Sequence, residues 1–451
     1  MPRWASLLAI LLLFRIVGCY DDQYRGSQIY RLQIPETAVD SVMEALVSGE
    51  DTSVYDVLRS PRTRGDYADV MVKSTALDDF KGIITTHKVD AQLIDEDVER
   101  SIRRAKRENS QALSRSRSRR SVGKRLTHHV YLPFNVVRVY GLKYDTTNPP
   151  QLCKLTLNHL TMFDLLKMEA VLHEIAQDYQ FVSLEELGKT VENRSIWLLK
   201  ISMNKSLPII WIDAGIHARE WIAPATAFYL IDRLLSRDGA SMLRKYQFYI
   251  APQINPDGYV YSFSRSRYWR KNRNQTGHSE CYGIDLNRNF PFRWGYSGSS
   301  SNPCSDTFKG LRGGDQAETR SIITKLSSIA NQTKLYLTLH SYGQYILTPY
   351  GFQRGLHPAN YDELMRLALK IIYKVWKKCG DVYTTGSSAD LLYAASGASD
   401  DFACGHLNIP YIYTVELPDE GAYNFLLPPA YIPLVGKEMW TALGVLVEYM
   451  K

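Results

Sequence analysis

The sequence predicts an α/β protein in which a mixed, mainly parallel sheet carries helices on both faces and follows a small α+β domain. Short β-branched stretches alternate with amphipathic helices over the C-terminal part of the chain. A second alternation, on a scale of roughly ten residues, occupies Tyr30 to about Arg107. Between the two lies a basic segment without apolar periodicity, so we expect two folded domains joined by a linker.

Residues 1–19 have the pattern of a secretory signal peptide. Arg3 precedes the apolar run Trp4 to Phe14, and small residues follow at Gly18 and Cys19. This run is shorter than the about 20 residues that a spanning helix needs, and no later stretch is long and apolar enough. We therefore expect a secreted, extracellular protein without a membrane span. Four N-x-S/T sequons fit this expectation, at Asn193, Asn204, Asn274 and Asn331.

The N-terminal domain, placed at residues 25–107, has its own order of strands and helices. We expect a ferredoxin-like α+β arrangement, because strand-like and helical patterns take turns along it. The patterns are a strand at Tyr30 to Ile34, a helix at Glu36 to Glu50, a strand at Ala68 to Lys73, an amphipathic helix at Ala76 to His87 and a charged helix at Asp95 to Arg107.

Residues 108–157 are predicted to be a basic linker followed by a stretch of unassigned role. Between Ser101 and Arg125 there are ten Lys or Arg residues and one acid, which leaves −2 for the rest of a chain whose net charge is +7. The positive charge is local, so it does not predict nucleic-acid binding. Ser110 to Arg125 is either a solvated linker or a cleavage site for a trypsin-like or dibasic-processing protease. The second interpretation describes a zymogen.

The C-terminal domain, placed at residues 158–451, supplies the main sheet. Its strand patterns are Leu207 to Asp213, Lys334 to Leu339 and Tyr411 to Val415. Amphipathic helices are expected at Thr161 to Asp178, Trp221 to Leu235, Tyr361 to Trp376 and Leu434 to Met450. Strands that alternate with helices indicate a sheet covered on both faces.

Four chemistry-bearing residues follow the predicted strands. His217 and Glu220 form an H-x-x-E pattern after the first strand, His340 follows the second and Glu416 the third. The H-x-x-E pattern alone is weak, but catalytic groups gather beyond the carboxyl ends of strands in such sheets. A catalytic zinc typically takes three protein ligands and leaves one position for water. His217, Glu220 and His340 would be those ligands, with Glu416 as a base.

Seven motifs show a resemblance to a known family. From about residue 158 onward the chain resembles the zinc carboxypeptidases of the A/B type, most closely the B type, and residues 25–107 resemble their activation segment. The motifs are IDAGIHAREWI (212–222), QINPDGYVYS (253–262), RYWRKNR (267–273), GIDLNRNF (283–290), LTLHSYGQ (337–344), YAASGASDDF (393–402) and YTVELPDEGAYNFLLP (413–428). The resemblance implies a carboxypeptidase-like catalytic domain made as a zymogen.

The resemblance also implies catalytic roles. His217, Glu220 and His340 would hold one zinc ion, and Glu416 would activate the attacking water. Arg270 would stabilise the developing oxyanion. Asp285 would lie behind His217 and orient its ring.

Recognition of a free peptide C-terminus is implied for a further group of residues. Asn287, Arg288 and Tyr393 match the family positions that bind the terminal carboxylate, for which the planar fork of arginine is suited. In isolation, Asn287 and Arg288 could equally be a surface turn. Arg219 could be a substrate contact or a solvated loop charge. Ser341 and Tyr342, within LTLHSYGQ, are also implied to contact the substrate.

Asp400 is expected to select the terminal side chain. It occupies the position where A-type enzymes carry an apolar residue and B-type enzymes an acid. A carboxylate at the base of a closed pocket favours substrates ending in Lys or Arg, because their charge would otherwise be buried unpaired. The alternatives are that Asp400 and Asp401 only cap the following helix, or that the preference is A-type.

The resemblance further implies a disulfide between Cys281 and Cys304. The pairing of Cys153, Cys379 and Cys404 stays open. We therefore expect a monomeric, secreted zinc exopeptidase. A non-catalytic peptide-binding homologue would be expected to lack a ligand or Glu416, and a constitutively active processing enzyme would lack the N-terminal domain.

Overall fold

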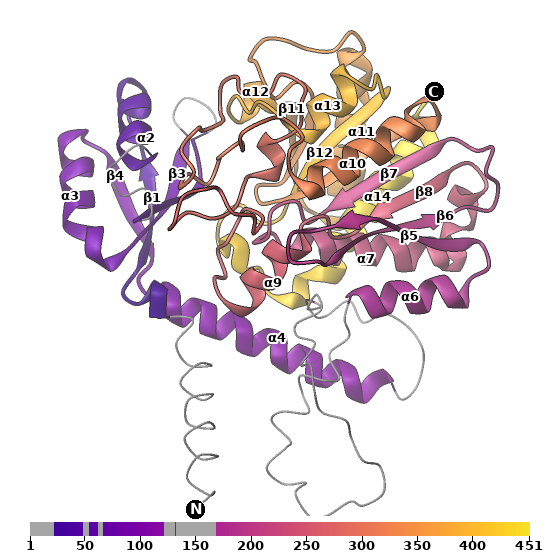
Figure 1. Cartoon of the computed structure of the whole chain (residues 1–451), viewed down its shortest axis with the longest axis horizontal. Coiled ribbons are helices and arrows are strands. Elements are labelled where there is room, and N and C mark those ends of the chain that lie inside the picture. The colour runs from indigo at the N-terminus through magenta and orange to yellow at the C-terminus, as the bar shows by residue number, and fades with distance from the viewer. Residues whose placement is uncertain (1–21, 48–53, 62–65, 121–130, 132–167) are drawn as a thin grey trace, which may run out of the picture.

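A computed structural model describes residues 22–47, 54–61, 66–120, 131 and 168–451 (Figure 1). The predicted signal peptide at residues 1–19, Cys153 and all of the unassigned stretch 122–154 except Tyr131 lie outside the described residues. So do residues 161–167 of one predicted helix. No helix among the described residues combines the length and the apolar character that crossing a bilayer requires.

The N-terminal domain is a four-stranded antiparallel sheet with two helices, which confirms its predicted fold. The strand order is β2-β3-β1-β4, the order of a ferredoxin-like domain. Strands β2 and β4 were not predicted, because neither shows a clear apolar alternation; β4 is also largely exposed. The elements are β1 (Gln28–Gln33), α2 (Val39–Val47), β2 (Tyr55–Arg59), β3 (Tyr67–Val72), α3 (Leu77–Thr86) and β4 (Asp90–Asp95).

Helix α4 corrects the prediction of an unstructured basic linker. It runs from Val98 to Arg120, thirteen residues beyond the predicted end at Arg107, and passes beneath the C-terminal domain (Figure 1). Arg is a good helix former, and an i,i+4 ion pair joins Arg104 to Glu108 at 3.0 Å. The start of the helix is held by burial, because Val98 and Ile102 are fully buried. High charge therefore did not prevent order here.

The C-terminal domain is built on an eight-stranded mixed sheet in the order β11-β10-β12-β9-β7-β8-β6-β5. The pairs within β12-β9-β7-β8 are parallel, and antiparallel pairs lie on both sides of them. The strands are β5 (Val182–Lys189), β6 (Ser195–Ile201), β7 (Ile209–Ala214), β8 (Gln247–Ala251), β9 (Thr333–Ser341), β10 (Tyr345–Thr348), β11 (Thr384–Ser387) and β12 (Tyr411–Leu417).

Helices cover both faces of this sheet, as predicted (Figure 1). Side chains of α6, α7, α11 and α14 pack on one face, and those of α10 and α13 pack on the other. All six residues of β7 are buried, which is the reason that its sequence is a continuous apolar run. The helices are α6 (Met168–Asp178), α7 (Ile222–Leu235), α8 (Ala240–Leu243), α9 (Pro256–Ser264), α10 (Ala317–Ile329), α11 (Tyr361–Cys379), α12 (Ser388–Leu391), α13 (Ser399–Gly405) and α14 (Ile432–Tyr449).

One apolar cluster joins the two domains. Val98, Ile102 and Met71 of the N-terminal domain share it with Tyr268 and Tyr342 of the C-terminal domain. Because buried side chains of both domains contact one another here, their burial stabilises the docked arrangement. The N-terminal domain therefore docks in a defined position beside the carboxyl ends of β7, β9 and β12.

A buried carboxyl group makes the stability of the C-terminal domain depend on pH. Glu438 in α14 is 2% exposed, and its Oε2 accepts a 2.7 Å hydrogen bond from the Tyr383 hydroxyl. Burial and the nearby Asp381 carboxyl raise the pKa of Glu438 to about 8. The folded state therefore favours the protonated form of Glu438 more than the unfolded state does.

We expect this group to destabilise the protein as the pH rises. The raised pKa of Glu438 means that its stabilising contribution is complete below the unfolded pKa of about 4.3 and is lost as the pH rises through about 8. The thermal unfolding midpoint should therefore fall less steeply with pH over this range in Glu438→Gln than in the parent. Glu448→Gln, at an exposed position of the same helix, is the matched control and should keep the parent slope. Equal slopes in all three proteins would contradict this account.

Candidate functional site

His217, Glu220 and His340 converge behind the carboxyl ends of β7 and β9. His217 and Glu220 lie in the turn between β7 and α7, and His340 lies near the end of β9. All three are buried, with 4%, 3% and 2% of their surface exposed. One ligand atom from each lies within 4.8 Å of the others. The predicted ligand set is thus brought together by strands that are adjacent in the sheet.

The geometry of the three side chains suits a cation. The Nδ1 atoms of His217 and His340 face each other at 3.2 Å, and Glu220 oxygens lie 2.7 and 3.2 Å from them. Two nitrogen lone pairs at that distance repel unless a proton or a cation lies between them. Burial lowers the pKa of His340, but the Glu220 carboxylate outweighs burial and raises that pKa to about 9. Two imidazoles and one carboxylate are a donor set that fits zinc.

Asp285 lies directly behind His217, in the position that the resemblance implied. It is fully buried, and its Oδ1 is 3.2 Å from His217 Nε2. Its Oδ2 accepts hydrogen bonds of 3.1 and 2.9 Å from Arg270. Burial raises the pKa of Asp285, but the guanidinium of Arg270 holds it well below its usual range. A charged Asp285 directs His217 Nδ1 toward the other two ligands.

The RYWRK motif is attached to the H-x-x-E turn by its backbone. The carbonyl of Arg270 accepts a 2.9 Å hydrogen bond from the amide of Ala218, between His217 and Glu220. The Arg270 side chain meanwhile lines the same cavity as the three ligands. Its position is therefore fixed both by the main chain and by Asp285.

Glu416 is placed by strand register. β12 pairs with β9 in parallel, and in this ladder Glu416 lies opposite His340. The side chain is only partly buried and lines the cavity. Its charge also contributes to the raised pKa of His340. A carboxylate beside the ligand set and open to the cavity is placed to accept a proton from a water molecule there.

One cavity of about 700 Å³ brings together all the predicted site residues except Asp285, which lies behind it. The predicted residues along its wall are His217, Arg219, Glu220, Arg270, Asn287, Arg288, His340, Ser341, Tyr342, Tyr393, Asp400 and Glu416. They come from six of the seven sequence motifs, which are separated by up to about two hundred residues. The tertiary fold is what makes them one site.

Arg288 lies in a buried turn rather than on the surface. It is 2% exposed, its Nε donates a 2.7 Å hydrogen bond to the carbonyl of Gly298, and its guanidinium lies 5.9 Å from the Tyr393 ring centroid. The neighbouring Asn287 accepts a 3.0 Å hydrogen bond from the amide of Ser399. The interpretation of these two residues as an exposed turn is therefore wrong. Arg288 and Asn287 face the cavity from a rigid support.

The two adjacent aspartates of α13 have different surroundings. Asp401 accepts 2.8 Å hydrogen bonds from the amides of Gly351 and Phe352, so it joins α13 to the loop after β10. Asp400 is 4% exposed, accepts a 2.9 Å hydrogen bond from Thr414 and lines the cavity. Both lie in the first turn of the helix, where a negative charge is favoured by the helix dipole. Of the two, only Asp400 faces the space where a substrate side chain can lie.

The N-terminal domain forms part of the cavity wall. Arg219 is 3% exposed, and its Nη1 lies 3.0 and 3.1 Å from the two carboxylate oxygens of Asp56 in β2. Asp306 approaches the same nitrogen at 3.3 Å. Arg219 is thus not a solvated loop charge. Sequence reasoning missed Asp56, because nothing local marks a residue whose partner is 163 positions away.

A second polar contact joins the domains at Tyr342. Its hydroxyl donates to Asn424 Oδ1 at 2.8 Å and lies 3.3 Å from Asp69 Oδ2 in β3. Asp69 also accepts a 2.8 Å hydrogen bond from Arg31. With the Asp56 contact, this places carboxylates of the N-terminal domain against two residues predicted to contact substrate.

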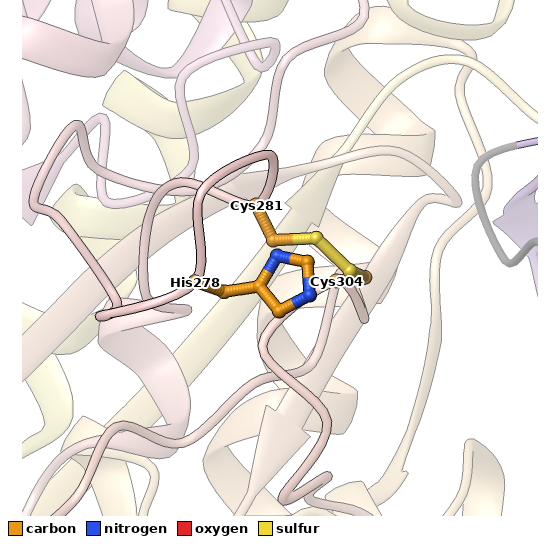
Figure 2. A group of neighbouring side chains, drawn as sticks. All are labelled: His278, Cys281 and Cys304. Atoms are coloured by element: carbon orange, nitrogen blue, oxygen red, sulfur yellow. A yellow bond between two sulfur atoms is a disulfide. The ribbon is translucent and has the colours of Figure 1, made fainter.

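Figure 2 shows the disulfide between Cys281 and Cys304, which confirms the pairing implied by the resemblance. The His278 imidazole lies beside it. Because both sulfurs are used in the disulfide, this trio does not offer thiolate ligands for a metal. Cys379 and Cys404 are not disulfide-bonded in the structure.

Comparison with known families matches both domains. Residues 168–442 match the zinc carboxypeptidase family, and residues 35–105 match the carboxypeptidase activation peptide. Carboxypeptidase B of Astacus astacus is 40% identical over 293 residues, which are 64% of this chain and 96% of that protein. Zinc carboxypeptidase A 1 of Anopheles gambiae is 30% identical over 99% of this chain and 94% of its own length.

A solved structure shares the arrangement of both domains. The carboxypeptidase A from Helicoverpa armigera superposes with a TM-score of 0.78 at 28% sequence identity, over 94% of this chain and 97% of that one. The ferredoxin-like N-terminal domain and the mixed-sheet C-terminal domain are therefore found together in a relative.

The ligand set predicts how metal content responds to substitution. We expect the purified protein to bind one zinc ion per chain, measured by atomic emission after dialysis. His340→Ala removes one of three donors and should reduce the bound zinc to well under half, because catalytic sites rely on three protein ligands. His278→Ala, beside the disulfide, is the matched control and should keep full zinc. Equal zinc in His340→Ala and the parent would exclude this residue as a ligand.

Proposed function

This chain belongs to the zinc carboxypeptidase family and carries the activation peptide of that family, and we propose that it is a secreted zymogen that removes C-terminal Lys or Arg from peptides. The N-terminal domain is accordingly the activation domain, and the C-terminal domain is the catalytic domain.

The composition of a single cavity supports the proposal. It contains a metal donor set, a carboxylate opposite one of the ligands, and a buried arginine that can meet a carboxylate in a bidentate way. An exopeptidase needs these three functions within the length of one residue of substrate. An endopeptidase has no use for Arg288 in that place, since a mid-chain residue has no free carboxylate.

We assign the zinc to His217, Glu220 and His340. When bound, zinc supplies a Lewis acid that polarises the scissile carbonyl and lowers the pKa of water. Glu416 takes the proton of the attacking water and passes it to the leaving amine. Arg270, fixed by Asp285, stabilises the oxyanion.

Asn287, Arg288 and Tyr393 hold the terminal carboxylate of the substrate. This anchors the end of the peptide, so the bond before the last residue meets Glu416 and the ligand set. Arg288 is already held by Gly298 and by the carbonyl of Asn287. A preorganised donor loses little entropy on binding, which strengthens carboxylate recognition.

Asp400 supports a preference for basic terminal residues. Its carboxylate lies on the cavity wall with Thr414 and Ser388, and Arg288 is part of the same wall. A Lys or Arg side chain would pair with Asp400, whereas an aromatic side chain would leave a carboxylate desolvated and unpaired. The named relatives include both A and B types, so this preference depends on Asp400 itself.

The activation domain accounts for latency. Asp56 forms an ion pair with Arg219, and residues of β2 and β3 form one side of the cavity. We propose that a trypsin-like or dibasic-processing protease cuts the basic segment between Ser110 and Arg125, after which the domain dissociates. Exposed sequon side chains at Asn193, Asn204 and Asn331 are consistent with secretion.

The preference for basic residues can be tested on the trypsin-treated protein. We expect it to release Arg and Lys from peptides at least tenfold faster than Phe or Leu, and a zinc chelator should abolish release. Asp400→Asn should lower kcat/KM for Arg-ending peptides by about 100-fold, because the substrate charge loses its buried partner. Asp401→Asn, which faces two backbone amides instead, should lower stability without inverting the preference. Faster release of Phe by the parent would show an A-type enzyme.

Glu416→Gln separates metal binding from proton transfer. The amide keeps the shape of the side chain but cannot take a proton, so kcat should fall by about 100-fold or more. Zinc content should stay at the parent value, because Glu416 is outside the ligand set. Parent-like turnover of this variant would remove Glu416 as the base.

A further inference from the structure

Tyr131 is a buried residue to which neither the sequence motifs nor the family matches give a role. The match to the activation peptide ends at residue 105 and the match to the zinc carboxypeptidase family begins at residue 168, so Tyr131 lies between the two matches. It is nevertheless only 4% exposed and belongs to the main apolar cluster of the catalytic domain. A residue at this place in the chain is buried that deeply only if specific contacts hold it.

Helix α4 of the activation domain holds the main chain of Tyr131. The amide of Tyr131 donates a 2.8 Å hydrogen bond to Asn109 Oδ1, and Asn109 Nδ2 donates a 3.3 Å bond to the Tyr131 carbonyl. The side-chain amide of Asn109 thus satisfies both backbone polar groups of Tyr131, as a neighbouring strand would. Asn109 is itself 7% exposed, so both hydrogen bonds are shielded from water.

The catalytic domain holds the side chain of Tyr131. Its hydroxyl donates a 2.7 Å hydrogen bond to the carbonyl of Leu427, and its ring lies edge-on to Trp221 with centroids 5.7 Å apart. Trp221 is the residue after Glu220, and Leu427 follows the loop that contains Phe425. One tyrosine therefore contacts both the metal-ligand turn and the loop after Glu416.

We propose that Tyr131 is the anchor by which the catalytic domain retains its own N-terminal segment. Asn109 is the residue through which the activation domain binds that anchor. Asn109 precedes the basic segment Ser110–Arg125, and Tyr131 follows it. A cut in that segment assigns Asn109 to the released piece and Tyr131 to the enzyme. The pair therefore remains a non-covalent contact between the two pieces after the chain is cut.

The contacts of Tyr131 extend to a substrate-binding residue. The Phe425 ring lies 4.5 Å from the Arg219 guanidinium, and the Phe425 carbonyl accepts a hydrogen bond from Arg267. Arg267 in turn stacks on Trp221 at 3.7 Å. Tyr131 contacts Leu427 and Trp221, and it thereby fixes the two segments that hold Phe425 and Arg267 beside Arg219. It acts as a positioning residue for Arg219, which lies next to Glu220.

The first test follows the two pieces after activation and rests on the proposed activation by cleavage. The trypsin-treated parent must gain peptidase activity, and failure of that gain would refute the proposed function rather than the anchor. In the active material, mass spectrometry should place Tyr131 at or near the start of the catalytic chain. Its recovery on the activation piece would overturn the anchor.

The second test compares Asn109→Ala with Gln111→Ala, an exposed position of the same helix. Loss of two buried hydrogen bonds should speed dissociation of the cut activation domain roughly tenfold, measured as the rise of activity after dilution. Gln111→Ala should dissociate at the parent rate. Both active enzymes should share the parent kcat and KM, since residue 109 has left. Dissociation of Asn109→Ala at the parent rate would overturn the role of Asn109.

The third test measures positioning in the active enzyme. Tyr131→Phe keeps the ring but loses the bond to Leu427, so KM for a tetrapeptide that reaches Arg219 should rise roughly fivefold. The kcat value and the KM for a blocked dipeptide should stay at parent values, because neither depends on Arg219. A purely structural anchor would change both substrates alike or neither, and either result would overturn the positioning role.

Discussion

A single buried carboxylate, Asp285, is the interaction on which the rest of the catalytic cleft depends. It is fully buried and meets His217 on one oxygen and Arg270 on the other. Its Oδ1 also accepts a hydrogen bond from the backbone amide of Asn287, in the turn that contains Arg288. A buried charge is tolerated only when it is paired and hydrogen-bonded. The need to satisfy Asp285 thus places His217, Arg270 and the turn of Asn287 and Arg288 relative to one another.

The same constraint explains how the activation domain can block the cleft without entering the metal site. Arg219 is as deeply buried as the ligands beside it and needs a carboxylate partner. In the zymogen Asp56 is that partner, and the apolar cluster around Met71, Tyr268 and Tyr342 supplies the area that holds the domain in place. Charge complementarity and apolar burial therefore act together at this interface. While the domain is docked, Asp56 keeps Arg219 paired and buried.

Sequence patterns predicted three of the eight strands of the main sheet, β7, β9 and β12, in which nearly every residue is buried. The runs that became β7, β9 and β12 are apolar because both sheet faces are covered, and α11 shows one apolar face. The failures occurred where a segment lacks such a pattern. Strand β4 is an exposed edge, and α4 continues to Arg120 through a stretch judged too charged to order. In α4, local helix propensity and i,i+4 pairs outweighed the charge that favoured disorder.

The sequence by itself determined the chemistry of this protein, because side-chain type and motif spacing are local properties. It predicted the donors His217, Glu220 and His340, the arginines and Asp400, and its resemblance to the family implied the pairing of Cys281 with Cys304, which the structure confirms. Only the tertiary structure decided which charges meet across long separations, as Asp56 does with Arg219. It also decided that Tyr131 belongs to the catalytic core. These outcomes depend on how two domains and eight strands pack, and packing between distant segments leaves no periodic trace in the sequence.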